Sequence, residues 1–147
     1  MITDKIVIAS DHAGYTLKEK LVDYLEKKGM KVTDLGTDST KPVDYADFAH
    51  PLADSIEKGE FQYGISICGS GNGINMTVNK HQKIRSAICW NEEISRLARY
   101  HNDANICSLP ARFIDEQLAY KIVDIFLNTG FEGGRHITRI NKIPVKK

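Results

Sequence analysis

Short apolar runs alternate along the chain with longer segments whose apolar residues recur at helical spacing. The runs are rich in β-branched residues, which is typical of buried strands, and the clearest of them covers residues 5–10. Such an alternation indicates a parallel sheet with helices on both faces. We expect five strands, at 5–10, 31–36, 63–68, 85–89 and 104–108, and five helices, at about 15–28, 46–58, 74–78, 91–100 and 114–127.

The same pattern predicts one domain over residues 1–147. The chain has four prolines, no low-complexity tract and no internal repeat, and no linker interrupts it. A chain of this length buries about 70% of the surface that it exposes when unfolded, so a single core can stabilise it. From about residue 130 the tail is basic, with no acid after Glu132, and we expect it to extend outside the sheet. The order of the last two strands stays open.

The charge and the cysteine content limit which partners and which cellular compartment we expect for this protein. The chain has 20 Lys and Arg against 19 Asp and Glu, a formal net charge of +1, which argues against nucleic acid or an anionic membrane as the main partner. No run approaches the ~18 apolar residues of a membrane span, and the amino terminus lacks a signal-peptide pattern. Three cysteines without metal-ligand spacing fit neither a disulfide framework nor a zinc site, so we expect a reducing cytoplasm. Cys89 and Cys107 lie inside predicted strands, and we expect them to be small buried side chains.

The segment after the third strand has the most distinctive chemistry. It runs from Cys68 to Gly73 with the sequence CGSGNG. Glycines at alternate positions let backbone N–H groups approach a negatively charged oxygen without interference from Cβ atoms. Cys68 lies where a strand meets a helix, a position that favours ionisation of a thiol, and the thiolate could accept a proton. A tight turn without a ligand is the alternative for the glycines alone.

Two nucleotide-binding interpretations of this loop fail on its residues. A P-loop needs Lys followed by Ser or Thr after the glycines, whereas Ile74 and Asn75 follow here. A dinucleotide-binding fingerprint has the spacing GxGxxG near the first strand, whereas the spacing here is GxGxG in the middle of the chain.

Two histidines lie in loops beside carboxylates. His12 follows the first strand and His101 precedes the last one. Asp11 and Asp103 are close to them in sequence and could each fix a histidine tautomer. Proton transfer is therefore one interpretation of these histidines, and a structural role is the other.

Two arginines in the tail could bind an anion. Arg135 and Arg139 are four residues apart, so one helical turn would place both guanidinium groups on the same face, where they could bind a phosphate. The alternative is a solvated basic tail. Nucleic-acid binding is not favoured, because the tail has no interleaved aromatic residues.

Together these motifs resemble type B ribose-5-phosphate isomerases, in the sugar-phosphate isomerase family that includes allose- and galactose-6-phosphate isomerases. The resemblance covers residues from about 4 to 140. It rests on ASDHAG at 9–14, DLGT at 34–37, Tyr45, CGSGNG at 68–73, NK at 79–80, RSA at 85–87, HNDAN at 101–105 and the paired Arg135 and Arg139. It implies a Rossmann-like α/β/α sandwich that works without metal or cofactor in carbohydrate metabolism, as a homodimer or a dimer of dimers.

The resemblance implies an aldose–ketose isomerisation through an enediolate. By that resemblance, His101 opens the furanose ring with help from Asp11, and Cys68 transfers the C2 proton to C1. The glycine-loop amides and the Ser70 hydroxyl would stabilise the enediolate oxygen. Some family members instead carry a glutamate directly after the last glycine; Ile74 occupies that position here, which puts the chain in the thiol-base branch.

The resemblance also implies the binding residues. His12 and Arg112 would bind the phosphate together with Arg135 and Arg139, and Tyr45 would contact the sugar. The neighbouring subunit would supply His101, Asn102, Arg135 and Arg139. The complete implied binding set is His12, Tyr45, Gly69, Gly71, Asn72, Gly73, Asn102, Arg112, Arg135 and Arg139, with no metal ligand.

Three other functions remain open. An isomerase for allose 6-phosphate or another hexose phosphate would need only a slightly deeper pocket than one for ribose 5-phosphate. A non-catalytic sugar-phosphate or nucleotide sensor would use the glycine loop and the arginines but would not need a base at Cys68 and an acid at His101. A flavodoxin-like or receiver domain shares the strand pattern but needs an acidic pocket or a flavin loop, which the sequence lacks.

Overall fold

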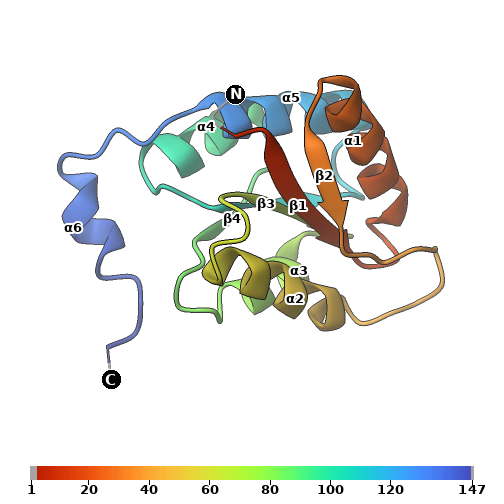
Figure 1. Ribbon diagram of the computed structural model, residues 1–147, viewed down its shortest axis with the longest axis horizontal. Helices are drawn as coiled ribbons and strands as arrows, with labels where there is room; N and C mark the ends of the chain where they lie inside the picture. The colour runs from red at the N-terminus through yellow and green to blue at the C-terminus, as the bar shows by residue number, and fades with distance from the viewer. Residues whose placement is uncertain (1–2, 147) are drawn as a thin grey trace.

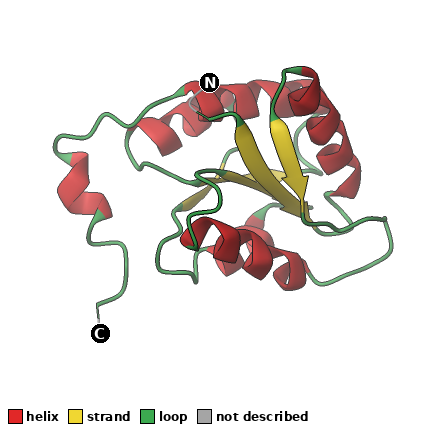
Figure 2. Ribbon diagram, viewed as in Figure 1, coloured by secondary structure: helices red, strands yellow, loops and turns green. Residues whose placement is uncertain are grey.

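The computed structural model describes residues 3–146 as a five-stranded parallel sheet between two layers of helices (Figures 1 and 2). The strands are β1 (Lys5–Ser10), β2 (Lys31–Asp34), β3 (Gly64–Cys68), β4 (Ser86–Ile88) and β5 (Ile106–Pro110). The helices are α1 (Tyr15–Lys27), α2 (Tyr45–Glu57), α3 (Asn72–Val78), α4 (Glu92–Tyr100), α5 (Glu116–Asn128) and α6 (His136–Ile140). The α/β/α fold expected from the sequence is confirmed, and the described helices include one, α6, that the apolar pattern did not predict.

The strand order is β2-β1-β3-β5-β4, with every neighbouring pair parallel. The chain moves outward from β1 to β2 and then returns to the other side of β1 to form β3. The carboxyl ends of β1 and β3 therefore flank a topological switch point, where diverging loops open a crevice for ligands. β5 lies between β3 and β4, which answers the question of strand order that the sequence left open.

Alternate residues of the central strands enter two different cores, because successive side chains of a strand point to opposite faces of the sheet. Ile6 and Ile8 belong to the core that α1, α4 and α5 cover. Val7 and Ala9 belong to the core beneath α2 and α3. Cys68 is part of this second core, so its side chain lies on the α2–α3 face.

The chain leaves the sandwich after α5. We call residues 129–146 the arm. Its helix α6 stands apart from the other helices (Figure 1), and near its end the Val145 N–H donates a hydrogen bond to Gln82 Oε1 at 3.0 Å. The apolar side chains of Ile137, Ile143 and Val145 are 47%, 54% and 68% exposed. With only five residues, α6 is too short to produce a periodic apolar pattern. No helix of the described residues is long and apolar enough to span a membrane.

Candidate active site

The loops after β1 and β3 meet at the switch point. The Asp11 N–H donates a hydrogen bond to the carbonyl of Ile67, at 3.2 Å, which places Asp11 beside the end of β3. Gly14, where α1 begins, lies so close to β3 that a Cβ there would stand 2.7 Å from the Ile67 carbonyl oxygen. The tight contact brings Asp11 and His12 to the same edge of the sheet as Cys68.

The carboxylate of Asp11 does not contact His12, contrary to the sequence-based expectation. Its Oδ1 accepts a hydrogen bond from the Gly14 N–H at 3.0 Å, and the same N–H lies 3.2 Å from the Asp11 carbonyl oxygen, ahead of the first turn of α1. The Nδ1 atom of His12 instead accepts a hydrogen bond from the Val43 N–H at 3.1 Å. In the neutral imidazole the proton is therefore on Nε2, which can donate to an anion.

Cys68 ends β3 at the base of the glycine turn. Cys68 is 4% exposed, and its carbonyl oxygen accepts a hydrogen bond from the Ala111 N–H at 2.9 Å. The next residue, Gly69, accepts one from the Arg112 N–H at the same distance. A Cβ on Gly69 would stand 3.3 Å from the Arg112 Nη1 atom, so the guanidinium group lies directly against the turn. The structure thus brings the predicted base and a predicted phosphate ligand together.

The turn itself needs glycine at position 71. Gly71 has a φ of +79°, and a Cβ there would stand 3.3 Å from the backbone carbon of Leu109. Ser70 Oγ accepts a hydrogen bond from the Asn72 N–H at 3.2 Å, which leaves the Ser70 hydroxyl proton available as a donor. The amides of Ser70 and Gly71 find no acceptor among residues 3–146. Together these groups are donors for a negatively charged oxygen.

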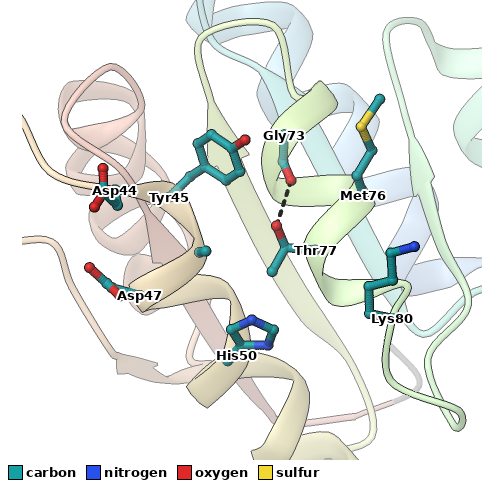
Figure 3. A pocket seen from close by; sticks show the side chains of 9 residues that line it. Asp44, Tyr45, Asp47, His50, Gly73, Met76, Thr77 and Lys80 are labelled. Atoms are coloured by element: carbon teal, nitrogen blue, oxygen red, sulfur yellow. Dashed lines mark hydrogen bonds between the residues drawn. The ribbon is translucent and has the colours of Figure 1, made fainter.

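Tyr45 covers the other end of the turn. A Cβ on Gly73 would lie 2.5 Å from the Tyr45 ring, so the ring packs directly on the glycine. Beside this contact, a cavity of about 520 Å³ opens between α2 and α3, and its lining includes His50, Met76 and Lys80 (Figure 3). Tyr45 therefore borders both the turn and an open space. We call Asp11, His12, Tyr45, Cys68–Gly73 and Arg112 the carboxyl-edge group.

His101 and Asn102 lie at the opposite ends of the strands from Cys68. They follow α4 and precede β5, so they belong with the amino ends of the strands, near Arg85, which precedes β4. The five residues of β3 separate the two edges by about 16 Å at the usual rise per residue. A single chain therefore does not bring His101 and Cys68 together.

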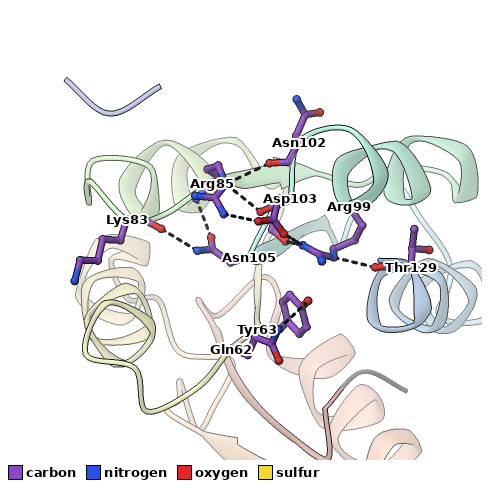
Figure 4. A network of polar contacts seen from close by, with 10 residues as sticks. Gln62, Tyr63, Lys83, Arg85, Arg99, Asn102, Asp103, Asn105 and Thr129 are labelled. Carbon is purple, nitrogen blue, oxygen red and sulfur yellow. Dashed lines mark hydrogen bonds and ion pairs between the residues drawn. The ribbon is translucent and has the colours of Figure 1, made fainter. Parts of the chain in front are cut away.

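Asp103 does not contact His101 either, because two arginines hold its carboxylate. Arg99 Nη1 donates to Asp103 Oδ1 at 2.8 Å, and Arg85 Nη2 lies 3.2 Å from Oδ2 (Figure 4). The expectation that Asp103 fixes the tautomer of His101 is wrong. A charge-assisted pair with a guanidinium group is stronger than a hydrogen bond to a neutral imidazole.

His101 is instead linked to the arm. Its ring stacks on that of His136, with the ring centroids 4.5 Å apart and the planes at 18°. His136 Nε2 lies 3.1 Å from Glu132 Oε1, and Arg135 Nη1 lies 3.5 Å from the same oxygen. A hydrogen bond from Tyr100 and the contacts with His136 and Arg135 lower the pKa of Glu132.

The two predicted arm arginines differ in their surroundings. Both are exposed, but Arg135 lies before α6 and pairs with Glu132, whereas Arg139 lies near the end of α6. We call His101, Asn102, Arg135 and Arg139 the arm-side group. His136, which joins its members, was given no role at the sequence level, although its place between the two arginines was a signal.

Within residues 3–146, two groups of side chains could hold a metal ion. They are His101, Glu132 and His136, and Asp54, Glu57 and His81, and in each the donor atoms lie within 4.8 Å of one another. Neither contains a residue of the carboxyl-edge group.

The other two cysteines are buried, as expected. Cys89 and Cys107 are both 0% exposed. Burial, reinforced by the neighbouring Cys89 thiol, raises the pKa of Cys107 well above its ordinary value. A thiol with a raised pKa stays protonated, so Cys107 is not placed to accept a proton.

The fold and the carboxyl-edge group define a class of protein: an α/β/α enzyme with a thiol, free amides and a guanidinium group gathered at the switch point of a parallel sheet. Residues 6–143 match the model of the family described as Ribose/Galactose Isomerase. The chain belongs to this family and is an isomerase.

Individual relatives agree with this assignment. The chain is 39% identical to ribose-5-phosphate isomerase B of Escherichia coli, over 95% of this chain and 93% of that protein. The crystal structure of a ribose 5-phosphate isomerase from Thermotoga maritima is 50% identical, covers 95% of this chain and 97% of its own, and has a TM-score of 0.94. That of ribose-5-phosphate isomerase B from Mycoplasma genitalium, with bound ribulose-5-phosphate, is 42% identical, covers 97% and 95%, and has a TM-score of 0.91.

Proposed function

We propose that this chain interconverts ribose 5-phosphate and ribulose 5-phosphate, with Cys68 as the base, in a site assembled from two copies of the chain. The observation that carries the proposal is the position of Cys68, beside the glycine turn and the guanidinium group of Arg112. The substrate is inferred from relatives named ribose-5-phosphate isomerase B and from the one that binds ribulose-5-phosphate.

The first step is ring opening. Ribose 5-phosphate is a cyclic hemiacetal, so a proton must leave the anomeric hydroxyl and another must reach the ring oxygen before the aldehyde forms. His101 carries out this transfer, with Asp11 as its assistant from the other subunit. Asp11 keeps Oδ2 for this task, since Oδ1 accepts the Gly14 amide.

The second step moves a proton between adjacent carbons. The Cys68 thiolate removes the C2 proton of the aldehyde, and the electron pair forms an enediolate with its negative charge on the C1 oxygen. The proton of the C2 hydroxyl group then passes to the C1 oxygen, which leaves the charge on the C2 oxygen. The Cys68 thiol returns its proton to C1, and the C2 carbonyl group of the ketone forms. The free amides of Ser70 and Gly71 and the Ser70 hydroxyl stabilise the charged oxygen, an effect worth about 10²- to 10³-fold per donor.

Groups from both edges bind the rest of the substrate. The His12 Nε2–H and Arg112 from one chain, with Arg135 and Arg139 from the other, bind the phosphate. Tyr45 and Asn102 contact the sugar hydroxyls.

The distance between the two groups of residues supports a shared site. His101 and Cys68 lie at opposite edges of one sheet, so a common substrate can reach both only if they come from different chains. The arm supports this proposal, because it projects from the sandwich with exposed apolar side chains and carries Arg135 and Arg139 (Figure 1). A two-fold interface would use such an arm twice and create two identical sites.

Tandem-tagged heterodimers test this proposal. A dimer that combines a Cys68→Ala chain with a His101→Ala chain keeps one complete site if the sites are shared, and we expect about half of the wild-type turnover per dimer. The matched control combines a wild-type chain with a chain carrying both substitutions, and this pair should have almost none. The opposite result would place each site within one chain.

Kinetics with several sugar phosphates test the substrate. We expect kcat/KM to be highest for ribose 5-phosphate and lower for allose 6-phosphate. A preference for a hexose phosphate would assign the chain to the hexose branch of the family. Binding of ribose 5-phosphate without turnover would show a sensor.

A further inference from the structure

Asp103 has a backbone conformation that L-residues rarely adopt. Its φ is +48°, and no other non-glycine residue within 3–146 has a positive φ. It directly follows His101 and Asn102, so its conformation sets the path of the backbone that carries both side chains. Strained residues of this kind persist only where the surroundings hold them, and they gather at functional sites.

Two arginines from different elements hold Asp103 in this conformation (Figure 4). Arg99, on α4, donates to Oδ1 at 2.8 Å, and Arg85, before β4, donates to Oδ2 at 3.2 Å. The Nε atom of Arg85 also lies 3.0 Å from the carbonyl oxygen of Asp103 and 3.2 Å from that of Asn102. The backbone of residues 102 and 103 is thus fixed through both its side chain and its carbonyl groups.

We call the contacts of Arg85 and Arg99 with residues 102 and 103 the clamp. Arg99 connects the clamp to the arm. Its side chain is 3% exposed, lies over the Tyr63 ring at 4.6 Å, and donates to the carbonyl oxygens of Ala104 at 2.6 Å and Thr129 at 3.1 Å. Thr129 is the first residue of the arm. One buried guanidinium group therefore connects the turn that carries His101 with the segment that leads to Arg135.

From this geometry we infer that Asp103, clamped by Arg85 and Arg99, is a positioning residue for ring opening. A connection between a helix and a strand needs no buried arginine and no strained aspartate, because glycine adopts a positive φ without strain. What the clamp adds is a fixed direction for His101 relative to the arm. The inference rests on the proposed function, since it assumes that His101 opens the sugar ring.

A comparison of two reactions separates positioning from a general structural role. Ribulose 5-phosphate cannot form a furanose ring, because its C5 oxygen carries the phosphate. Exchange of its C1 hydrogen with deuterium from D2O therefore needs proton transfer at Cys68 but not ring opening. Turnover of ribose 5-phosphate needs both steps.

The variant Asp103→Asn suits this comparison. Asparagine keeps the size of the side chain and tolerates a positive φ, but it loses the charge that both guanidinium groups bind. We expect turnover of ribose 5-phosphate to fall about 10- to 100-fold, as for other residues that orient a functional group, while C1 exchange changes less than about 3-fold.

Three further variants make the outcome decisive. Arg85→Lys perturbs the clamp from its more exposed side. It should likewise lower turnover of ribose 5-phosphate much more than it lowers C1 exchange. Asp23→Asn removes an exposed ion pair with Lys27 on α1 and should change neither reaction. His101→Ala is the benchmark for a loss of ring opening: if it turns over ribose 5-phosphate normally, the proposed function fails at that step.

The inference about Asp103 has its own failing outcomes. Suppose that His101→Ala loses turnover of ribose 5-phosphate but keeps C1 exchange, while Asp103→Asn turns over ribose 5-phosphate like the wild type. Asp103 then does not position the ring-opening group. If Asp103→Asn lowers turnover and exchange equally, the residue serves only the fold.

Discussion

Cys68 and His101 lie at opposite edges of one parallel sheet, the first at the carboxyl end of β3 and the second before the amino end of β5. β3 and β5 are neighbours in the sheet, but the two residues lie at opposite ends of these strands, so the length of a strand separates them. A reaction that needs both must recruit one of them from another chain.

The thiol of Cys68 should be indispensable for proton transfer. We expect Cys68→Ala to lower kcat by at least about 10²-fold, the usual contribution of a positioned base. Binding of ribose 5-phosphate, measured by calorimetry, should persist, because the guanidinium groups proposed to bind the phosphate are intact. Cys68→Ser is the matched control for side-chain size and should be impaired as well. Turnover close to wild type in either variant contradicts the assignment of the base.

Arg135 should act on binding of the phosphate. It is exposed on the arm and pairs only weakly with Glu132, at 3.5 Å, so its loss should not affect the fold. We expect Arg135→Ala to raise KM at least about 10-fold, since a charge-assisted hydrogen bond contributes roughly 1.5–3 kcal/mol. Lys142→Ala, also on the arm, should leave KM unchanged. An unaltered KM in Arg135→Ala removes this residue from the phosphate site.

The glycine turn offers a test of close packing at position 71. Gly71 and Gly59 have nearly the same φ, +79° and +78°, but a Cβ on Gly71 would meet the Leu109 backbone at 3.3 Å, whereas nothing lies within 4 Å of one on Gly59. Both alanine variants bear the backbone strain, about 1–2 kcal/mol. We expect Gly71→Ala to be the less stable of the two in urea unfolding, and to lose activity because the amides of the turn shift. Equal stability and equal activity would argue that the turn adjusts freely.

Glu57 should make stability depend on pH. Burial alone raises the pKa of this carboxyl group, but hydrogen bonds from His81 and the Lys83 N–H outweigh burial, and the net pKa lies below its ordinary value of 4.5. A lowered pKa means that the folded state prefers the ionised form, so the stabilisation is present above pH 4.5 and is lost as the pH falls through the folded-state pKa.

The variant Glu57→Gln measures this contribution. Near neutral pH we expect it to lower the free energy of unfolding by about 1 kcal/mol, the usual net value of a hydrogen bond. The difference from the wild type should shrink as the pH falls below the ordinary carboxyl range. Glu60→Gln, at an exposed position beyond α2, is the control and should show no such trend. A difference that is constant with pH would contradict the role of the charge.

The carboxyl-edge group could be predicted largely from the sequence. The carboxyl ends of parallel strands meet at one edge, so a pattern that located β1 and β3 also brought Asp11, His12 and Cys68 together. The conformation of Gly71 was equally local, because a glycine turn at the end of a strand has few alternatives.

The partners of the polar side chains could not be predicted in this way. His12 accepts from Val43, and Asp103 binds Arg85, contacts that span 31 and 18 residues of the chain. The nearest carboxylate in sequence was the wrong partner for both histidines. A backbone amide at a helix start and a guanidinium group compete for a carboxylate more strongly than a neutral imidazole does.

By itself, the sequence determined the class of fold and the chemistry of the loop after β3, since both depend on periodicity and residue type over short stretches. Tertiary structure alone decided the insertion of β5 between β3 and β4, the clamp on Asp103 and the separation of His101 from Cys68. These features arise from contacts between distant segments, whose free energies depend on packing in three dimensions and leave no periodic trace along the chain.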